Sequence, residues 1–201
     1  MKINFDKKIK IIAVIKNRSL HDVNKIILKN NIKIIGINKI QEYKKNFISL
    51  RNIEKHFIGH LQSNKINDLL KYFDCLQTLD DFELAKQINE KTNKIFPVMI
   101  QINISKDPNK YGILPENAEL FLKRLSVLKK IKVIGLMTIT AKQNIIDSRS
   151  DYRKMRNIFN ICKDKYNLQE LSMGMSDDYK IAIEEGATMV RLGRILFEKN
   201  D

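Results

Sequence analysis

The sequence predicts a (β/α)8 barrel of the TIM type. Short apolar runs rich in β-branched residues alternate with longer amphipathic stretches, which is typical of parallel β/α architecture. Eight candidate strands and seven candidate helices alternate strictly, and this favours a closed barrel over an open, doubly wound sheet. The length of 201 residues lies at the lower end of the range for such barrels, so we expect a single domain over residues 1–201.

The expected elements follow from the apolar runs and the amphipathic stretches between them. The strands are expected at Ile9–Ile15, Lys33–Ile37, His56–Gly59, Tyr72–Thr78, Val98–Ile104, Lys132–Met137, Glu170–Met173 and Thr188–Leu192. The helices are expected at Leu20–Lys29, Lys39–Leu50, Asn64–Lys71, Phe82–Lys94, Pro115–Leu128, Arg149–Tyr166 and Asp178–Glu185. Pro115 suits a first helical turn, and Glu116 and Glu119 favour the N-terminus of the same helix.

The cysteine count and the hydropathy exclude several classes of protein. Cys75 and Cys162 are too few for a disulfide framework and lack CxxC spacing, which predicts a reducing compartment. No apolar run approaches the roughly 18 residues of a transmembrane helix. The segment Met1–Lys10 is too charged for a signal peptide. We therefore expect a cytoplasmic protein that does not associate with a membrane.

The formal net charge of +14 is a weak sign of a nucleic-acid partner. The sequence contains 32 Ile, 29 Lys and 20 Asn, all with A/T-rich codons, so nucleotide bias can raise the lysine count without selection for a basic surface. Arginine, the better phosphate reader, occurs only eight times, and the lysines are spread along the chain. We expect a solvated basic surface and no nucleic-acid partner.

The barrel prediction indicates where a ligand should bind. Functional groups of such barrels lie at the C-terminal ends of the strands, and anions bind at the loops after strands 7 and 8. The segment Ser172–Asp178 is a small, flexible turn that enters a helix, and Arg191–Arg194 follows the eighth strand. Exposed amides, a hydroxyl at a helix start and a glycine suit a phosphate. Lys16 ends the first strand beside this site, where it can form an imine with an aldehyde cofactor.

Six motifs at the predicted strand ends carry a family resemblance. They are Ile12–Lys16, Gly36–Glu42, His56–Lys65, Gln101–Ser105, Gly135–Thr138 and Leu171–Ser176. With these motifs in order over Ile11–Phe197, the sequence resembles the pyridoxal phosphate homeostasis proteins, which are single-domain relatives of the alanine racemase N-terminal barrel. The resemblance implies a barrel that holds pyridoxal 5′-phosphate (PLP) as a Schiff base, the internal aldimine, on Lys16.

The resemblance also implies roles for other residues. Arg191 would face the pyridine nitrogen, where a permanent cation disfavours ring protonation and makes the ring a poorer electron sink. Ser176, Gly193 and the Arg194 backbone would hold the phosphate, and Asn38 would be a polar neighbour of the cofactor. No metal is implied.

Three features depart from the family pattern. Ile37 stands where the family usually has Glu between Gly and Asn, which removes a carboxylate near the site. Arg194 replaces the usual Thr or Ser after Gly193, and its side chain either pairs with the phosphate or points to solvent. The leading helix of the family is reduced to Met1–Lys8, so we expect a shortened N-terminus.

Several other residues could be given a functional interpretation, but each also has a simpler structural interpretation. His56 and His60 have i, i+4 spacing, but the strand context and Gly59 favour structural roles over a metal site. Met173 and Met175 are expected to pack in a loop, and Asp177–Asp178 to open a helix. The loop Lys106–Gly112 is either a solvated turn or a flap near PLP.

The sequence therefore predicts a PLP carrier for intracellular PLP homeostasis, and not a conventional enzyme. We expect a monomer that binds PLP and passes it to PLP-accepting apoenzymes. A small PLP-dependent amino-acid racemase is the alternative, but the racemases draw a tyrosine base from a second domain and a partner subunit. A basic nucleic-acid-binding protein is the third alternative and rests on net charge alone.

Overall fold

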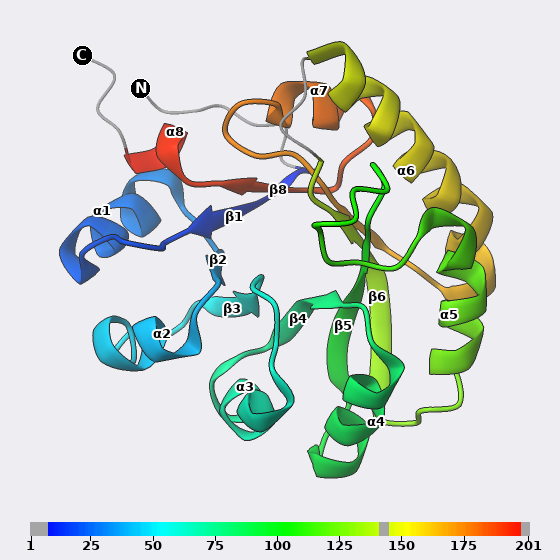
Figure 1. Cartoon of the computed structure of the whole chain (residues 1–201). Helices are drawn as coiled ribbons and strands as arrows, with labels where there is room; N and C mark the ends of the chain where they lie inside the picture. Colours follow the sequence, from blue (N-terminus) through cyan, green and yellow to red (C-terminus); the bar gives the residue numbers. More distant parts are fainter. Residues whose placement is uncertain (1–7, 141–144, 198–201) are drawn as a thin grey trace.

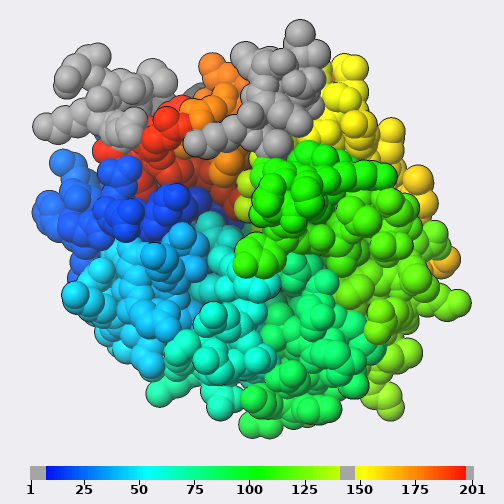
Figure 2. Space-filling model, in the orientation of Figure 1, coloured from blue at the N-terminus to red at the C-terminus, as the bar shows by residue number. Residues whose placement is uncertain are grey.

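Eight parallel strands close into a barrel in the order β1 to β8 (Figure 1). The computed structural model describes residues 8–140 and 145–197. The strands are β1 (Lys10–Val14), β2 (Ile34–Ile37), β3 (Glu54–Phe57), β4 (Cys75–Leu79), β5 (Phe96–Ile102), β6 (Ile131–Thr138), β7 (Glu170–Ser172) and β8 (Met189–Leu192). Closure pairs β1 with β8, where Ile12 lies opposite Arg191. The N-terminal and C-terminal strands are therefore neighbours, which Figure 2 shows as blue beside red. The predicted closed barrel is confirmed.

Helices surround the barrel and cover its outer face (Figure 1). They are α1 (Leu20–Asn30), α2 (Ile40–Asn46), α3 (Ile66–Tyr72), α4 (Phe82–Lys91), α5 (Ala118–Leu125), α6 (Ile145–Tyr166), α7 (Tyr179–Glu184) and α8 (Arg194–Phe197), with 3-10 turns η1 (Ser63–Lys65) and η2 (Pro115–Asn117). Pro115 stands in the first turn of η2, as its fixed φ requires. Ser19 and Asp81 cap α1 and α4 by accepting the Asp22 and Leu84 amides.

Strand alternation divides the core into two layers. One layer lies inside the barrel and contains Ile12, Ile34, Cys75, Met99, Met137 and Met189. The larger layer fills the space between the strands and the helices, with outward residues such as Val98, Leu136 and Val190. Because interior positions recur at every second residue, polar side chains in the same phase face one another across the barrel.

Several elements differ from the sequence prediction, and three of these differences have identifiable reasons. β3 begins at Glu54, before the apolar run, because the backbone of Glu54 and Lys55 pairs with β2. Tyr72 ends α3 instead of opening β4, and Tyr43 packs against both Tyr72 and Phe73. The eighth helix, α8, was not predicted, since four residues are too short for a periodic signal. The prediction for Met1–Lys8 lies, except for Lys8, outside the described residues.

Among the described residues, no helix combines the length and hydropathy needed to cross a membrane. Both cysteines are free thiols within the described fold and are buried, Cys75 inside the barrel and Cys162 on the side of α6 that faces the core.

Candidate functional site

The predicted site residues all lie in, or directly after, strands whose C-terminal ends meet at one face of the barrel. Lys16 follows β1 in a turn and is exposed. Asn38 follows β2, Ser176 lies in the loop after β7, and Gly193 separates β8 from α8. Arg191 lies within β8 and is buried. Parallel strands therefore place these five residues at the same mouth.

The side-chain oxygen of Asn38 is buried and lacks a hydrogen-bond donor among the described residues. Within the described part of the chain, no donor bonds its Oδ1, although this atom is shielded from solvent. Gly59, in the loop after β3, packs directly against the backbone of Asn38. A Cβ at Gly59 would lie only 2.2 Å from the Asn38 carbonyl oxygen, so this close approach requires glycine. An unsatisfied buried acceptor costs free energy, so Asn38 suits a ligand that brings a hydrogen-bond donor or a bridging water.

Ser176 joins the loops that follow β7 and β8. Its hydroxyl oxygen accepts the Gly193 amide at 3.2 Å and the Ile195 amide at 3.5 Å. A Cβ added at Gly193 would meet Val14 at 3.7 Å, an ordinary van der Waals contact, so the backbone there is not crowded. Backbone amides and a hydroxyl are a common setting for a phosphate.

Arg191 is a buried cation held by neutral groups. One guanidinium nitrogen donates to Ser172 Oγ at 2.8 Å and another to the Thr138 carbonyl at 2.8 Å. Burial lowers the pKa of Arg191 to about 10, and the nearby Tyr152 and Asp178 oppose that shift. Arg191 thus keeps its charge at neutral pH, and among the described residues it forms no ion pair with a carboxylate.

Tyr152 and Asp178 lie near Arg191, and the sequence did not identify them as its neighbours. The Tyr152 hydroxyl donates to Asp178 Oδ2 at 2.6 Å, and Asp178 Oδ1 accepts the Met175 amide at 2.7 Å. Burial raises the pKa of Tyr152 well above its usual range. Asp178 does precede α7, as predicted, but its carboxylate fastens the loop after β7 to α6. The sequence carries no local signal for a contact between residues 26 apart.

Arg194 does not direct its guanidinium into the site. Its side chain forms an exposed ion pair with Asp177. Of the two interpretations open for this side chain, the structure favours the surface, so Lys16 and Arg191 remain as the predicted site cations at the mouth.

The loop after β5 contacts the loop after β3. Asn103 Nδ2 donates to the carbonyls of Asp107 and Lys110 at 2.7 and 3.2 Å, which folds the loop back on its strand. The Tyr111 ring then stacks on His60 with centroids 3.7 Å apart. His56 has different partners inside the barrel, so the two histidines do not act as a pair.

Of the predicted methionine pair, Met173 is buried in the core, as expected for packing, whereas Met175 is 41 % exposed.

The charge distribution favours an anionic ligand. Arg191 is a buried cation, Lys16 adds an exposed amine, and Ser176 offers a hydroxyl between two loop backbones. A buried cation that is paired only with neutral dipoles is stabilised when a negative or electron-rich group approaches.

Comparisons with known proteins agree with the barrel fold. A family model for the alanine racemase N-terminal domain matches residues 2–201. The pyridoxal phosphate homeostasis protein of Aquifex aeolicus is 39 % identical over 83 % of this chain and 76 % of its own length. That of Haemophilus influenzae is 38 % identical over 94 % of this chain and 84 % of its own. PipY of Synechococcus elongatus, solved with PLP bound, superposes with a TM-score of 0.85 at 26 % identity, covering 97 % of this chain and 95 % of PipY. The chain belongs to the pyridoxal phosphate homeostasis protein family.

Proposed function

We propose that this protein is a PLP carrier that serves intracellular PLP homeostasis and is not a conventional enzyme. When bound, PLP supplies an aldehyde that condenses with a lysine amine and releases water. Lys16 is the lysine proposed for this Schiff base, since it is exposed at the mouth directly after β1. The observation that carries the proposal is the convergence of Lys16, Arg191 and Ser176 on one barrel end.

The other proposed site residues would bind either the phosphate of PLP or its pyridine ring. Ser176, the Gly193 amide and the Arg194 backbone are proposed to bind the phosphate, and the bond between the Gly193 amide and Ser176 Oγ, which brings these groups together, supports this. Arg191 is proposed to face the pyridine nitrogen, and the buried, unsatisfied Oδ1 of Asn38 supports a role as a polar neighbour of the cofactor.

The charge of Arg191 supports retention of PLP over turnover. A guanidinium that stays protonated near the ring nitrogen disfavours a protonated pyridine, so the ring withdraws electrons less effectively. The names of the relatives, pyridoxal phosphate homeostasis proteins, support a carrier in preference to a racemase. We further propose that the protein acts as a cytoplasmic monomer and releases PLP to apoenzymes.

The test is to locate the covalent linkage. The purified protein is incubated with PLP, its visible absorbance is recorded, and borohydride reduction is followed by peptide mapping. We expect label on Lys16 and loss of the visible band in Lys16→Ala. Lys39→Ala is the matched control, because Lys39 is an exposed lysine at the end of the next strand. Label on another residue, or no label in excess PLP, would contradict the proposal.

A further inference from the structure

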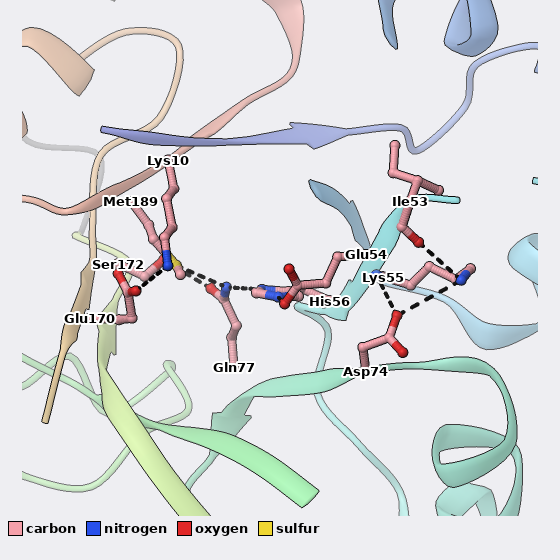
Figure 3. Close-up of polar contacts among 10 residues, drawn as sticks. All are labelled: Lys10, Ile53, Glu54, Lys55, His56, Asp74, Gln77, Glu170, Ser172 and Met189. Atoms are coloured by element: carbon pink, nitrogen blue, oxygen red, sulfur yellow. Dashed lines mark hydrogen bonds and ion pairs between the residues drawn. The ribbon is translucent and has the colours of Figure 1, made fainter. Parts of the chain in front are cut away.

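A continuous chain of hydrogen-bonded side chains crosses the barrel interior from Arg191 to Glu54. Arg191 donates to Ser172 Oγ at 2.8 Å, and the Ser172 hydroxyl donates to Gln77 Oε1 at 2.9 Å. Gln77 Nε2 lies 2.6 Å from His56 Nδ1, and His56 Nε2 lies 2.6 Å from Glu54 Oε1. Figure 3 shows Gln77 between Ser172 and His56. The chain links the proposed cofactor end of the barrel to a half-exposed carboxylate at the other end.

The chemistry of the groups fixes the direction of every bond at the His56 end. The hydrogen bond from His56 holds the pKa of Glu54 below its ordinary value, so Glu54 is a carboxylate and His56 Nε2 is the donor. An amide nitrogen donates and does not accept, so Gln77 Nε2 must donate to a bare Nδ1. His56 is therefore neutral, with its proton on Nε2.

The orientation of the Gln77 amide has independent support. Its nitrogen also lies 3.8 Å from the Met189 sulfur, which is a weak acceptor with no proton to give. Its oxygen lies on the opposite side, against the Ser172 hydroxyl. The reversed amide would place oxygen against the Met189 sulfur, which has no proton to donate.

This orientation determines what Ser172 offers to Arg191. Because Gln77 presents its oxygen, the Ser172 proton points toward Gln77 and a lone pair remains for the guanidinium. All donors then point the same way, from the cation of Arg191 toward the anion of Glu54. Bonds aligned in this way polarise one another and strengthen the whole chain.

We propose that Gln77, acting through Ser172 and with neutral His56 behind it, is a positioning residue that holds the Arg191 guanidinium against the cofactor ring. This inference rests on the proposed function, because it assumes that Arg191 faces PLP. A proton on His56 Nδ1 would confront the Gln77 amino group and force the amide to rotate. The rotated amide would present N–H to Ser172 and compete with Arg191 for its oxygen.

Charged and titratable groups near His56 come from several strands. Glu54 shares β3, Lys10 comes from β1, Glu170 from β7, and Cys75 on β4 pairs in register with His56. Lys10 and Glu170 are bonded to each other at the base of the barrel, and burial raises the pKa of the Cys75 thiol. Glu54 is thus the carboxylate that contacts the imidazole within the described fold.

The first measurement needs no cofactor. Nitrogen-15 NMR of the imidazole in unliganded protein is expected to show His56 as the neutral Nε2–H tautomer at neutral pH. In Gln77→Glu, a carboxylate that only accepts faces Nδ1, so a proton on that nitrogen is expected in this variant. An Nδ1–H tautomer or an imidazolium in the unaltered protein would overturn the inference, whatever the outcome for PLP.

The second measurement is the rate of PLP release. Gln77→Leu removes both the donor to His56 and the acceptor for Ser172, and is expected to release PLP about tenfold faster. Gln77→Glu keeps the acceptor and is expected to restore release to within about twofold of the unaltered protein. Cys75→Ala is the control, since it changes the same interior on β4 and removes no link. Equal release from all three variants would overturn the inference, and failure of the unaltered protein to label at Lys16 would instead overturn the proposed function.

Discussion

The Gly193 amide nitrogen lies 3.2 Å from the Ser176 hydroxyl oxygen, although the two residues are 17 positions apart. This bond ties the turn after β7 to the turn after β8. The protein groups proposed to bind the phosphate are therefore positioned relative to one another before any ligand binds. Binding then has to order fewer groups, which lowers its entropic cost.

Ser176→Ala should weaken PLP retention and leave the fold intact. The variant removes the acceptor of the Gly193 amide and a proposed phosphate ligand at a partly exposed position, so we expect about tenfold weaker binding. Spectroscopic titration with PLP and thermal unfolding measure the two effects. Arg194→Ala is the control, because its exposed pair with Asp177 should contribute no more than about 1 kcal/mol. Unchanged PLP content in Ser176→Ala would show that the phosphate assignment is wrong.

Gly59→Ala and Gly193→Ala should separate stability from binding. The added Cβ at Gly59 would lie 2.2 Å from the Asn38 carbonyl oxygen, a backbone atom, so we expect a loss of about 1–3 kcal/mol in the free energy of unfolding. At Gly193 the nearest atom is 3.7 Å away, so the unfolding free energy should change by less than about 0.5 kcal/mol. PLP binding should nevertheless weaken in Gly193→Ala. Urea unfolding and PLP titration of both variants check the prediction, and equal destabilisation would contradict it.

The hydrogen bond between His56 and Glu54 inside the barrel should make stability depend on pH in the acid range. The hydrogen bond from His56 places the folded pKa of Glu54 below its unfolded value of about 4.3. Glu54 therefore contributes stability above that unfolded value, and the contribution is lost as the pH falls through the folded pKa. The difference in unfolding free energy between the unaltered protein and Glu54→Gln should be constant from about pH 6 upward and shrink below about pH 4. A difference that grows toward acid pH would contradict the assignment.

Both cysteines should be unreactive until the protein unfolds. Cys75 and Cys162 are buried, and burial raises the pKa of each thiol, so the reactive thiolate is scarce. With a disulfide reagent at pH 8, we expect reaction to follow unfolding, and two thiols to titrate at once in concentrated urea. Fast modification of either thiol in the native protein would contradict the burial.

The barrel could be predicted because its signal is distributed along the whole chain. Every strand contributes an apolar run, so errors such as the start of β3 at Glu54 change a boundary without changing the architecture. The positions of Lys16 and Arg191 at one mouth followed from strand order alone, and they stay there in the structure.

The interior chain could not be predicted from local patterns. His56, Gln77 and Ser172 come from three strands, and their contacts depend on the phase and tilt of each strand in the closed barrel. The Tyr152–Asp178 bond likewise joins α6 to the loop after β7. Each of these side chains has an ordinary structural interpretation in the sequence, and the shared network becomes visible when the strands are placed around one axis.

The pairing of β1 with β8 also determines when a binding site exists during synthesis. Lys16 follows one of these strands and Arg191 lies in the other, so the longest sequence separation in the fold must be bridged before the two cations meet. Contacts of such separation form late, because the loop entropy has to be overcome first. A nascent chain that is still emerging from the ribosome can bury α2 to α6 against their strands, yet it lacks the completed mouth. Capture of the ligand would then report that β8 has docked beside β1.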